Sequence, residues 1–153
     1  MTKTKFQICE EKGRMIVEKL LHSNNNILKW EWQEQMCHFD LLYTGTSHCY
    51  VAEIKYRADY ASTASTITNT GLMLEKSKYN ALIEKAKDGY IALYLMLFND
   101  GLCAIYNVDA SKQLHWQKKT LPRYTAENAG TREKIITYIP ICECKKIRYN
   151  AND

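Results

Sequence analysis

The chain has 153 residues, of which 46% are hydrophobic, and its formal net charge is +4. This length suits one domain with a core of its own, so we expect a single domain over residues 1–153. The longest apolar run, Tyr90 to Phe98, is too short to cross a bilayer, and the start of the chain is charged rather than signal-like. These features exclude a helical membrane protein and favour a soluble, cytoplasmic one.

The cysteines and basic residues are scattered along the chain. No CxxC pair repeats, so reduced thiols are expected, and the Cys142-x-Cys144 spacing does not suit a zinc knuckle. The mildly basic net charge is compatible with nucleic acid without demonstrating it. Three basic clusters are each typical of a solvated face: Lys76 and Lys78; Lys118, Lys119 and Arg123; Lys145, Lys146 and Arg148.

The first part of the chain predicts a helix and then a strand. Apolar residues recur at helical spacing over residues 6–22, and the run Ser23 to Asn26 ends the helix. Its polar face carries several glutamates. Residues 27–32 alternate in polarity and predict a first strand.

A β-hairpin is predicted next. Phe39 to Tyr43 and Cys49 to Tyr56 are rich in aromatic and β-branched residues, and Thr44 to Ser47 supply the turn. Alternation along the second strand places Glu53 and Lys55 on the same face.

Asp40 and Glu53 share a face in any register that a two-residue loop allows. They lie directly opposite if Thr46 and Ser47 form the loop, and they are diagonal neighbours if Gly45 and Thr46 form it. Two such carboxylates repel each other unless a cation lies between them, and oxygen ligands suit Mg²⁺ or Mn²⁺. With Lys55 beside it, such a cation can support phosphate hydrolysis. The simpler interpretation is a surface ion pair between Glu53 and Lys55.

The middle of the chain alternates between irregular and regular segments. Residues 58–71 are rich in hydroxyl groups and lack periodicity, which predicts either a functional loop over the ligand or a plain connector. Residues 72–87 have helical spacing and end at Asp88-Gly89. Residues 90–98 and 102–108 predict a hairpin of buried strands around Asn99 to Gly101.

The tail from Asp109 is less regular. Leu114 to Trp116 and Ile135 to Ile139 predict short extended pieces, separated by a polar region over residues 118–133. We expect these pieces to be late additions to the sheet or a wrapping arm.

The order helix, three strands, helix, two strands, together with Asp40 and Glu53-Ile54-Lys55, resembles the PD-(D/E)XK nuclease superfamily. This superfamily includes restriction endonucleases and Holliday junction resolvases, and the spacing from Asp40 to Glu53 is similar to that of archaeal resolvases. Phe39 stands where the family name has proline. The resemblance covers residues 6–108 and implies an α/β fold: a restriction endonuclease-like αβββαβ core whose mixed central sheet is flanked by helices. Residues 109–153 would be a C-terminal extension.

The resemblance also implies roles for individual residues. Asp40, Glu53 and the carbonyl of Ile54 would bind Mg²⁺ or Mn²⁺, and Lys55 would act on the attacking water. A first-helix glutamate, Glu18 or else Glu11, would support the metal. A basic residue of the second helix would hold the phosphate, with Lys78 preferred to Lys76.

The leading hypothesis is therefore a metal-dependent nuclease that hydrolyses phosphodiester bonds in DNA, with a homodimer as the form that cuts two strands. The second hypothesis is a non-catalytic nucleic-acid or protein binding module with the same fold. A structural domain of phage or prophage origin is the third.

Overall fold

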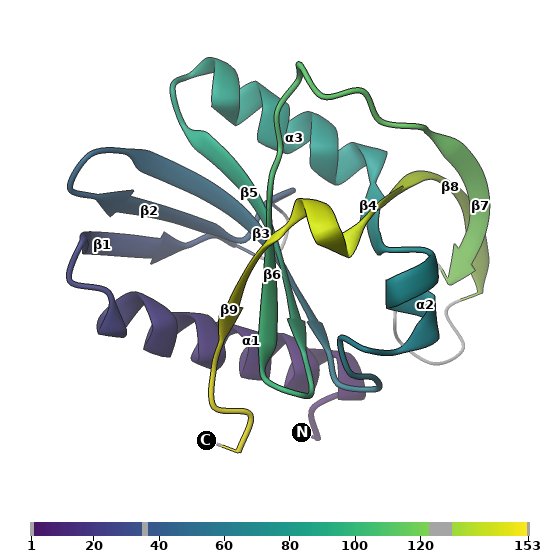
Figure 1. Ribbon diagram of the computed structural model, residues 1–153, viewed down its shortest axis with the longest axis horizontal. Coiled ribbons are helices and arrows are strands. Elements are labelled where there is room, and N and C mark those ends of the chain that lie inside the picture. Colours follow the sequence, from purple (N-terminus) through teal and green to yellow (C-terminus); the bar gives the residue numbers. More distant parts are fainter. Residues whose placement is uncertain (1, 35–36, 123–129, 153) are drawn as a thin grey trace.

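A six-stranded mixed sheet forms the centre of the computed structural model, which describes residues 2–34, 37–122 and 130–152. Figure 1 shows helix α1 along one face of this sheet and α3 on the other. The strand order is β1-β2-β3-β5-β6-β9, and a second sheet has the order β4-β8-β7. The main-sheet strands are β1 (Ile27–Trp32), β2 (Leu41–Gly45), β3 (Cys49–Arg57), β5 (Ile91–Phe98), β6 (Leu102–Asn107) and β9 (Lys145–Arg148). The arrangement is the predicted restriction endonuclease-like α/β core.

Helix α1 (Lys5–Ser23) confirms the first predicted helix. It begins with a capping box, in which the Thr4 side chain accepts the amide of Gln7 and the Gln7 side chain accepts the amide of Thr4. Its apolar stripe packs on the sheet face that carries Ala52 and Ile54. A Cβ placed on Gly13 would lie 3.2 Å from the Cβ of Tyr56, so a glycine here lets the helix approach β3 closely.

The predicted hairpin is confirmed as β2 and β3. Thr44 pairs with Cys49 and Leu41 with Ala52, and the Gly45 amide donates to the His48 carbonyl, so Thr46 and Ser47 form the loop. Strand β3 then pairs in parallel with β5 along its length, and this pairing places β3 at the centre of the sheet. The hairpin of β5 and β6 is confirmed as well, but β9 lies outside it and forms the edge of the sheet.

The second sheet corrects the prediction of one helix over residues 72–87. Residues 72–75 form strand β4 (Leu72–Glu75), and helix α3 (Lys76–Lys87) begins directly after it. Leu72 and Leu74 are buried in the core, and β4 pairs with β8 far along the chain. Because local spacing does not report a distant partner strand, tertiary pairing overrides the helical pattern here. The irregular segment before β4 also contains a short helix, α2 (Ser65–Asn69), which the sequence did not predict.

The tail differs most from expectation. The predicted piece Leu114 to Trp116 forms no strand, whereas β7 (Gln117–Pro122) and β8 (Thr131–Ile139) occupy much of the region expected to separate the two pieces. A short 3-10 helix, η1 (Ile141–Glu143), leads to β9. Strands β7 and β9 each contain two lysines, a residue type depleted in strands, so composition concealed them. Arg123 of one predicted basic cluster lies outside the described residues.

The cysteines of the described residues are all free thiols, as expected. No helix in the described part of the chain is long and apolar enough to cross a membrane.

Candidate functional site

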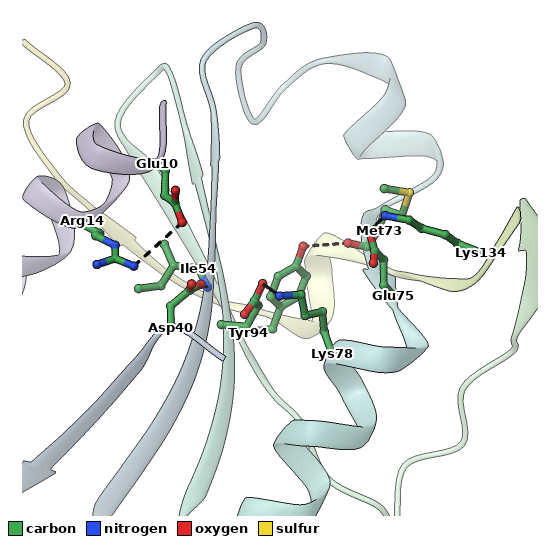
Figure 2. A network of polar contacts seen from close by, with 10 residues as sticks. Glu10, Arg14, Asp40, Ile54, Met73, Glu75, Lys78, Tyr94 and Lys134 are labelled. Carbon is green, nitrogen blue, oxygen red and sulfur yellow. Dashed lines mark hydrogen bonds and ion pairs between the residues drawn. The ribbon is translucent and has the colours of Figure 1, made fainter. Parts of the chain in front are cut away.

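Asp40 immediately precedes β2, whose ladder with β3 ends at the pair of Leu41 and Ala52. The Asp40 amide donates to the Ala52 carbonyl at 3.0 Å, and its carboxylate accepts the amide of Ile54 at 2.8 Å. The side chain of Asp40 thus occupies a position that a further backbone carbonyl of β2 would otherwise fill. This contact holds the carboxylate beside the middle of β3 (Figure 2).

The ladder of β2 and β3 ends at the pair of Leu41 and Ala52, and the Asp40 amide donates to the carbonyl of the same Ala52, one residue out of step with that register. Glu53 is the next residue of β3, and the Asp40 carboxylate lies close enough to it to raise its pKa. Glu53 is only 8% exposed, and its Oε1 lies 3.3 Å from the Lys78 ammonium. Its Oε2 is buried and has no hydrogen-bond partner among the described residues. An oxygen left in this state costs free energy, and a bound cation or a proton would satisfy it.

The electrostatics of Glu53 follow from its burial. Desolvation, together with repulsion from the nearby Asp40 carboxylate, raises the pKa of Glu53 to about 8, although the Lys78 ammonium opposes this rise. At neutral pH without a cation, the protonated form of Glu53 is therefore favoured.

Lys55 follows on the same face of β3, as predicted. Burial lowers its pKa, Arg57 and Lys134 lower it further, and Glu53 and Glu75 oppose that change. A lysine with a lowered pKa loses its proton more readily and can then act as a base.

The carbonyl of Ile54 points toward the side of β3 on which Asp40 lies. The Ala52 carbonyl and the Ile54 amide both point toward β2, and in a strand the amide and carbonyl of one residue point to the same side. The Ile54 carbonyl therefore also faces this side, beyond the start of β2. This direction suits the ligand role that the resemblance implies.

Lys78 lies in the first turn of α3 and reaches Glu53, whereas Lys76 lies over the Trp116 ring at 5.4 Å. The structure thus brings together Asp40, Glu53, Lys55 and Lys78 of the predicted site. These side chains come from the start of β2, from β3 and from α3.

The two predicted first-helix glutamates lie elsewhere. Glu18 accepts the Trp32 indole N–H at 2.6 Å, and Glu11 forms an exposed ion pair with Lys3. Instead, Glu10 lines a small pocket together with Asp40 and Ile54, and neither Glu18 nor Glu11 is part of that lining.

Glu10 is the site residue that the sequence reasoning missed. Gly13 was the available signal, because a glycine inside a strong helix marks where the helix approaches the sheet. Glu10 lies about one helical turn before Gly13, and Arg14 follows Gly13 directly. The Glu10 Oε1 and Arg14 Nη2 atoms are 4.0 Å apart (Figure 2).

The site continues toward the second sheet. The Tyr94 hydroxyl donates to the Met73 carbonyl at 2.8 Å, which ties β5 to β4, and Lys134 of β8 lies 2.9 Å from Glu75. Arg57 is close enough to Lys55 to lower its pKa, and its Nε is buried without a hydrogen-bond partner in the part of the chain described. Arg57 and Lys134 were not among the predicted site residues.

The donor set partly fits a hard cation. Oxygen ligands come from Asp40, Glu53 and the Ile54 carbonyl, and the unpartnered Oε2 of Glu53 favours a cation beside it. However, no three His, Cys, Asp or Glu side chains among the described residues gather closely enough to hold a metal ion. The protein therefore supplies two close carboxylates, and water or substrate oxygens would complete the coordination.

Comparison with known proteins supports the fold. No protein-family model matches the sequence, and no curated protein matches it. One similar solved structure is Hjc, a Holliday junction resolvase from the archaeal hyperthermophile Archaeoglobus fulgidus. It matches with a TM-score of 0.54 over 89% of this chain and 92% of that one, at 14% sequence identity. At this identity the likeness shows a shared fold, a resolvase-like core, and the activity belongs to the proposal below.

Proposed function

We propose that the protein is a Mg²⁺-dependent nuclease that hydrolyses phosphodiester bonds in DNA. The observation that carries the proposal is that Asp40, Glu53 and Lys55 lie close together beside the start of β2, while one buried oxygen of Glu53 has no hydrogen-bond partner among the described residues. A surface ion pair would leave Glu53 solvated, but this side chain is buried. The fold shared with a Holliday junction resolvase is consistent with the proposal.

Asp40, Glu53 and the Ile54 carbonyl would hold the cation, with Glu10 close enough to bind one of its waters. When bound, Mg²⁺ supplies charge that stabilises the negative phosphate oxygens and promotes ionisation of water. The amide of Ile54 fixes the Asp40 carboxylate in place before any ligand arrives. Such preorganisation lowers the cost of binding.

The neutral amine of Lys55 accepts the proton of the attacking water. The lowered pKa of Lys55 increases the fraction of this neutral amine. The water oxygen bonds to phosphorus, the bond from phosphorus to the leaving sugar oxygen breaks, and that oxygen takes up a proton from solvent. The lysine is then an ammonium that faces the developing negative charge. Lys78, in the first turn of α3, holds the phosphate.

The test is cleavage of labelled DNA by three proteins: wild type, Asp40→Asn and Lys55→Ala. The substrates are a linear duplex, a nicked duplex and a four-way junction, each with Mg²⁺ and with EDTA. We expect wild-type cleavage only with Mg²⁺ and its loss in both variants, while the melting temperature stays near that of the wild type. Cleavage by either variant at the wild-type rate would refute the mechanism.

A non-catalytic binding module is the second candidate, and one observation favours it. Lys78 already faces Glu53, and the described residues offer no three-ligand metal cluster. Calorimetric titration with Mn²⁺, with and without DNA, separates the two candidates. Binding that disappears in Asp40→Asn supports the nuclease, and no binding in either condition supports the module.

Cutting both strands of a duplex needs two active sites, so we further propose that the active form is a homodimer. Sedimentation of the protein with and without a four-way junction tests this point. A monomer in both conditions that still makes paired cuts would contradict it.

A further inference from the structure

Strands β7 and β8 form an antiparallel ribbon that is unusually basic, here called the β7–β8 ribbon (residues 117–122 and 131–139). Its positive residues are Lys118, Lys119, Arg132 and Lys134, and its only carboxylate is Glu133. In Figure 1 the ribbon lies beside α2 and the start of α3, on the opposite side of the molecule from β1 and β2.

The register divides these charges between the two faces of the ribbon. Lys119 pairs with Lys134 and Leu121 with Arg132, whereas Lys118 pairs with Ile135. Because side chains alternate along a strand, Lys119, Arg132 and Lys134 share one face, here called the basic face. Lys118 and Glu133 lie on the opposite face.

The basic face begins at the candidate active site. Lys134 is 15% exposed and lies 2.9 Å from Glu75, the residue directly before α3. Lys78 of the same helix reaches Glu53, so the two ion pairs lie at the same end of α3 (Figure 2). Lys134 is also close enough to Lys55 to affect its pKa. Farther along the ribbon, Lys119 and Arg132 are both exposed to solvent.

Two charges of the basic face have no carboxylate partner. Lys134 pairs with Glu75, but neither Lys119 nor Arg132 forms an ion pair among the described residues. The Lys119 ammonium contacts the Tyr138 side chain instead: it donates to the hydroxyl and lies 5.2 Å from the centroid of the ring. A row of phosphates would compensate several such charges at once, because a nucleic-acid backbone carries one negative charge per nucleotide.

We propose that the basic face, through Lys119 and Arg132, binds backbone phosphates of the DNA next to the bond that the active site cuts. The inference rests on the proposed nuclease function and extends its binding surface to the second sheet. These contacts position the substrate without reading its sequence.

The experiment measures binding of a fluorescently labelled linear duplex by anisotropy, in EDTA so that no cleavage occurs, over a series of KCl concentrations. The variants are Lys119→Gln, Arg132→Gln and the double variant. Lys118→Gln is the matched control, because it removes the same charge from the adjacent residue on the opposite face. All these positions are exposed, and melting temperatures check that the fold is kept.

Each lost phosphate contact lowers the slope of log Kd against log salt by about 0.9. We therefore expect Lys119→Gln and Arg132→Gln each to reduce the slope by about one and to weaken binding severalfold, with a reduction of about two in the double variant. Lys118→Gln should match the wild type in both slope and affinity.

The outcomes separate this proposal from the proposed function. If wild type cleaves DNA but Lys119→Gln and Lys118→Gln have equal slopes, the ribbon proposal is overturned and the nuclease stands. If the wild type cleaves no DNA, but the slope of log Kd against log salt falls in the basic-face variants and not in Lys118→Gln, the ribbon proposal stands and the nuclease proposal does not. Absence of duplex binding by the wild type at every salt concentration overturns the ribbon proposal.

Discussion

The Lys78 ammonium lies 3.3 Å from one oxygen of Glu53, while the other oxygen of the same carboxylate is buried without a partner among the described residues. The Asp40 carboxylate, directly before β2, is close enough to raise the pKa of Glu53 by repulsion. Glu53 therefore lies between one positive and one negative neighbour in a site with little water. Its protonation state controls how the site responds to pH and to cations.

Removal of the Glu53 carboxylate should change how stability depends on pH. The pKa of Glu53 is about 8 in the folded protein and near its ordinary value of 4.5 when unfolded. Between these values the folded state keeps a proton that the unfolded state has lost, so this group's contribution to stability falls as pH rises through the window. The slope is at most about 1.4 kcal/mol per pH unit.

Glu53→Gln should therefore become more stable relative to wild type as pH rises from 4.5 to 8. Urea unfolding at several pH values measures this difference. The Asp40→Asn variant serves as the control, because it removes the repulsion but leaves Glu53 buried. A constant difference in the free energy of unfolding across the window would contradict the protonation argument.

Loss of the Lys78 charge should shift the pH dependence of cleavage. Lys78 lowers the pKa of Glu53, so Lys78→Met raises that pKa and moves the acid limb of the pH–rate profile to higher pH. We also expect a lower kcat, because the phosphate loses a positive partner. Lys78→Arg keeps the charge and should restore the position of the acid limb. An acid limb that stays in place in Lys78→Met would rule out control through Glu53.

Substitutions of Glu10 and Glu18 in α1 should have different effects on cleavage and stability. Glu10 lines the pocket with Asp40, so Glu10→Gln should weaken Mg²⁺-dependent cleavage while the melting temperature changes little. Glu18 binds the Trp32 indole at 2.6 Å, so Glu18→Gln should cost about 1 kcal/mol of stability through a weakened hydrogen bond. Cleavage rates at saturating Mg²⁺ and thermal melts of both variants provide the comparison. The opposite pattern would return the metal-supporting role to Glu18.

The hydrogen bond from the Tyr94 hydroxyl to the Met73 carbonyl should stabilise the contact between the two sheets. Tyr94→Phe removes the hydroxyl and leaves the Met73 carbonyl without its donor, which costs about 1 to 3 kcal/mol. Denaturant unfolding measures the change, and the unchanged m-value checks that unfolding still exposes the same surface. Stability equal to the wild type would mean that water replaces the hydroxyl.

The sequence by itself determined the central hairpin and the carboxylates and lysine that it carries. Alternation along β3 placed Glu53 and Lys55 on one face, and the short loop constrained Asp40 to lie near Glu53, because both depend only on local geometry. The order of the helices and strands, and with it the α/β core, followed from the same local signals.

Only the tertiary structure decided which other residues join the site. Glu10 reaches it because Gly13 lets α1 approach β3, and Lys134 reaches it because β8 pairs with β4 far along the chain. Leu72 and Leu74 form a strand for the same reason, although their spacing suits a helix. Side-chain periodicity reports how a segment faces its surroundings but not which distant segment it will meet, so contacts of this kind depend on the packing of the whole chain.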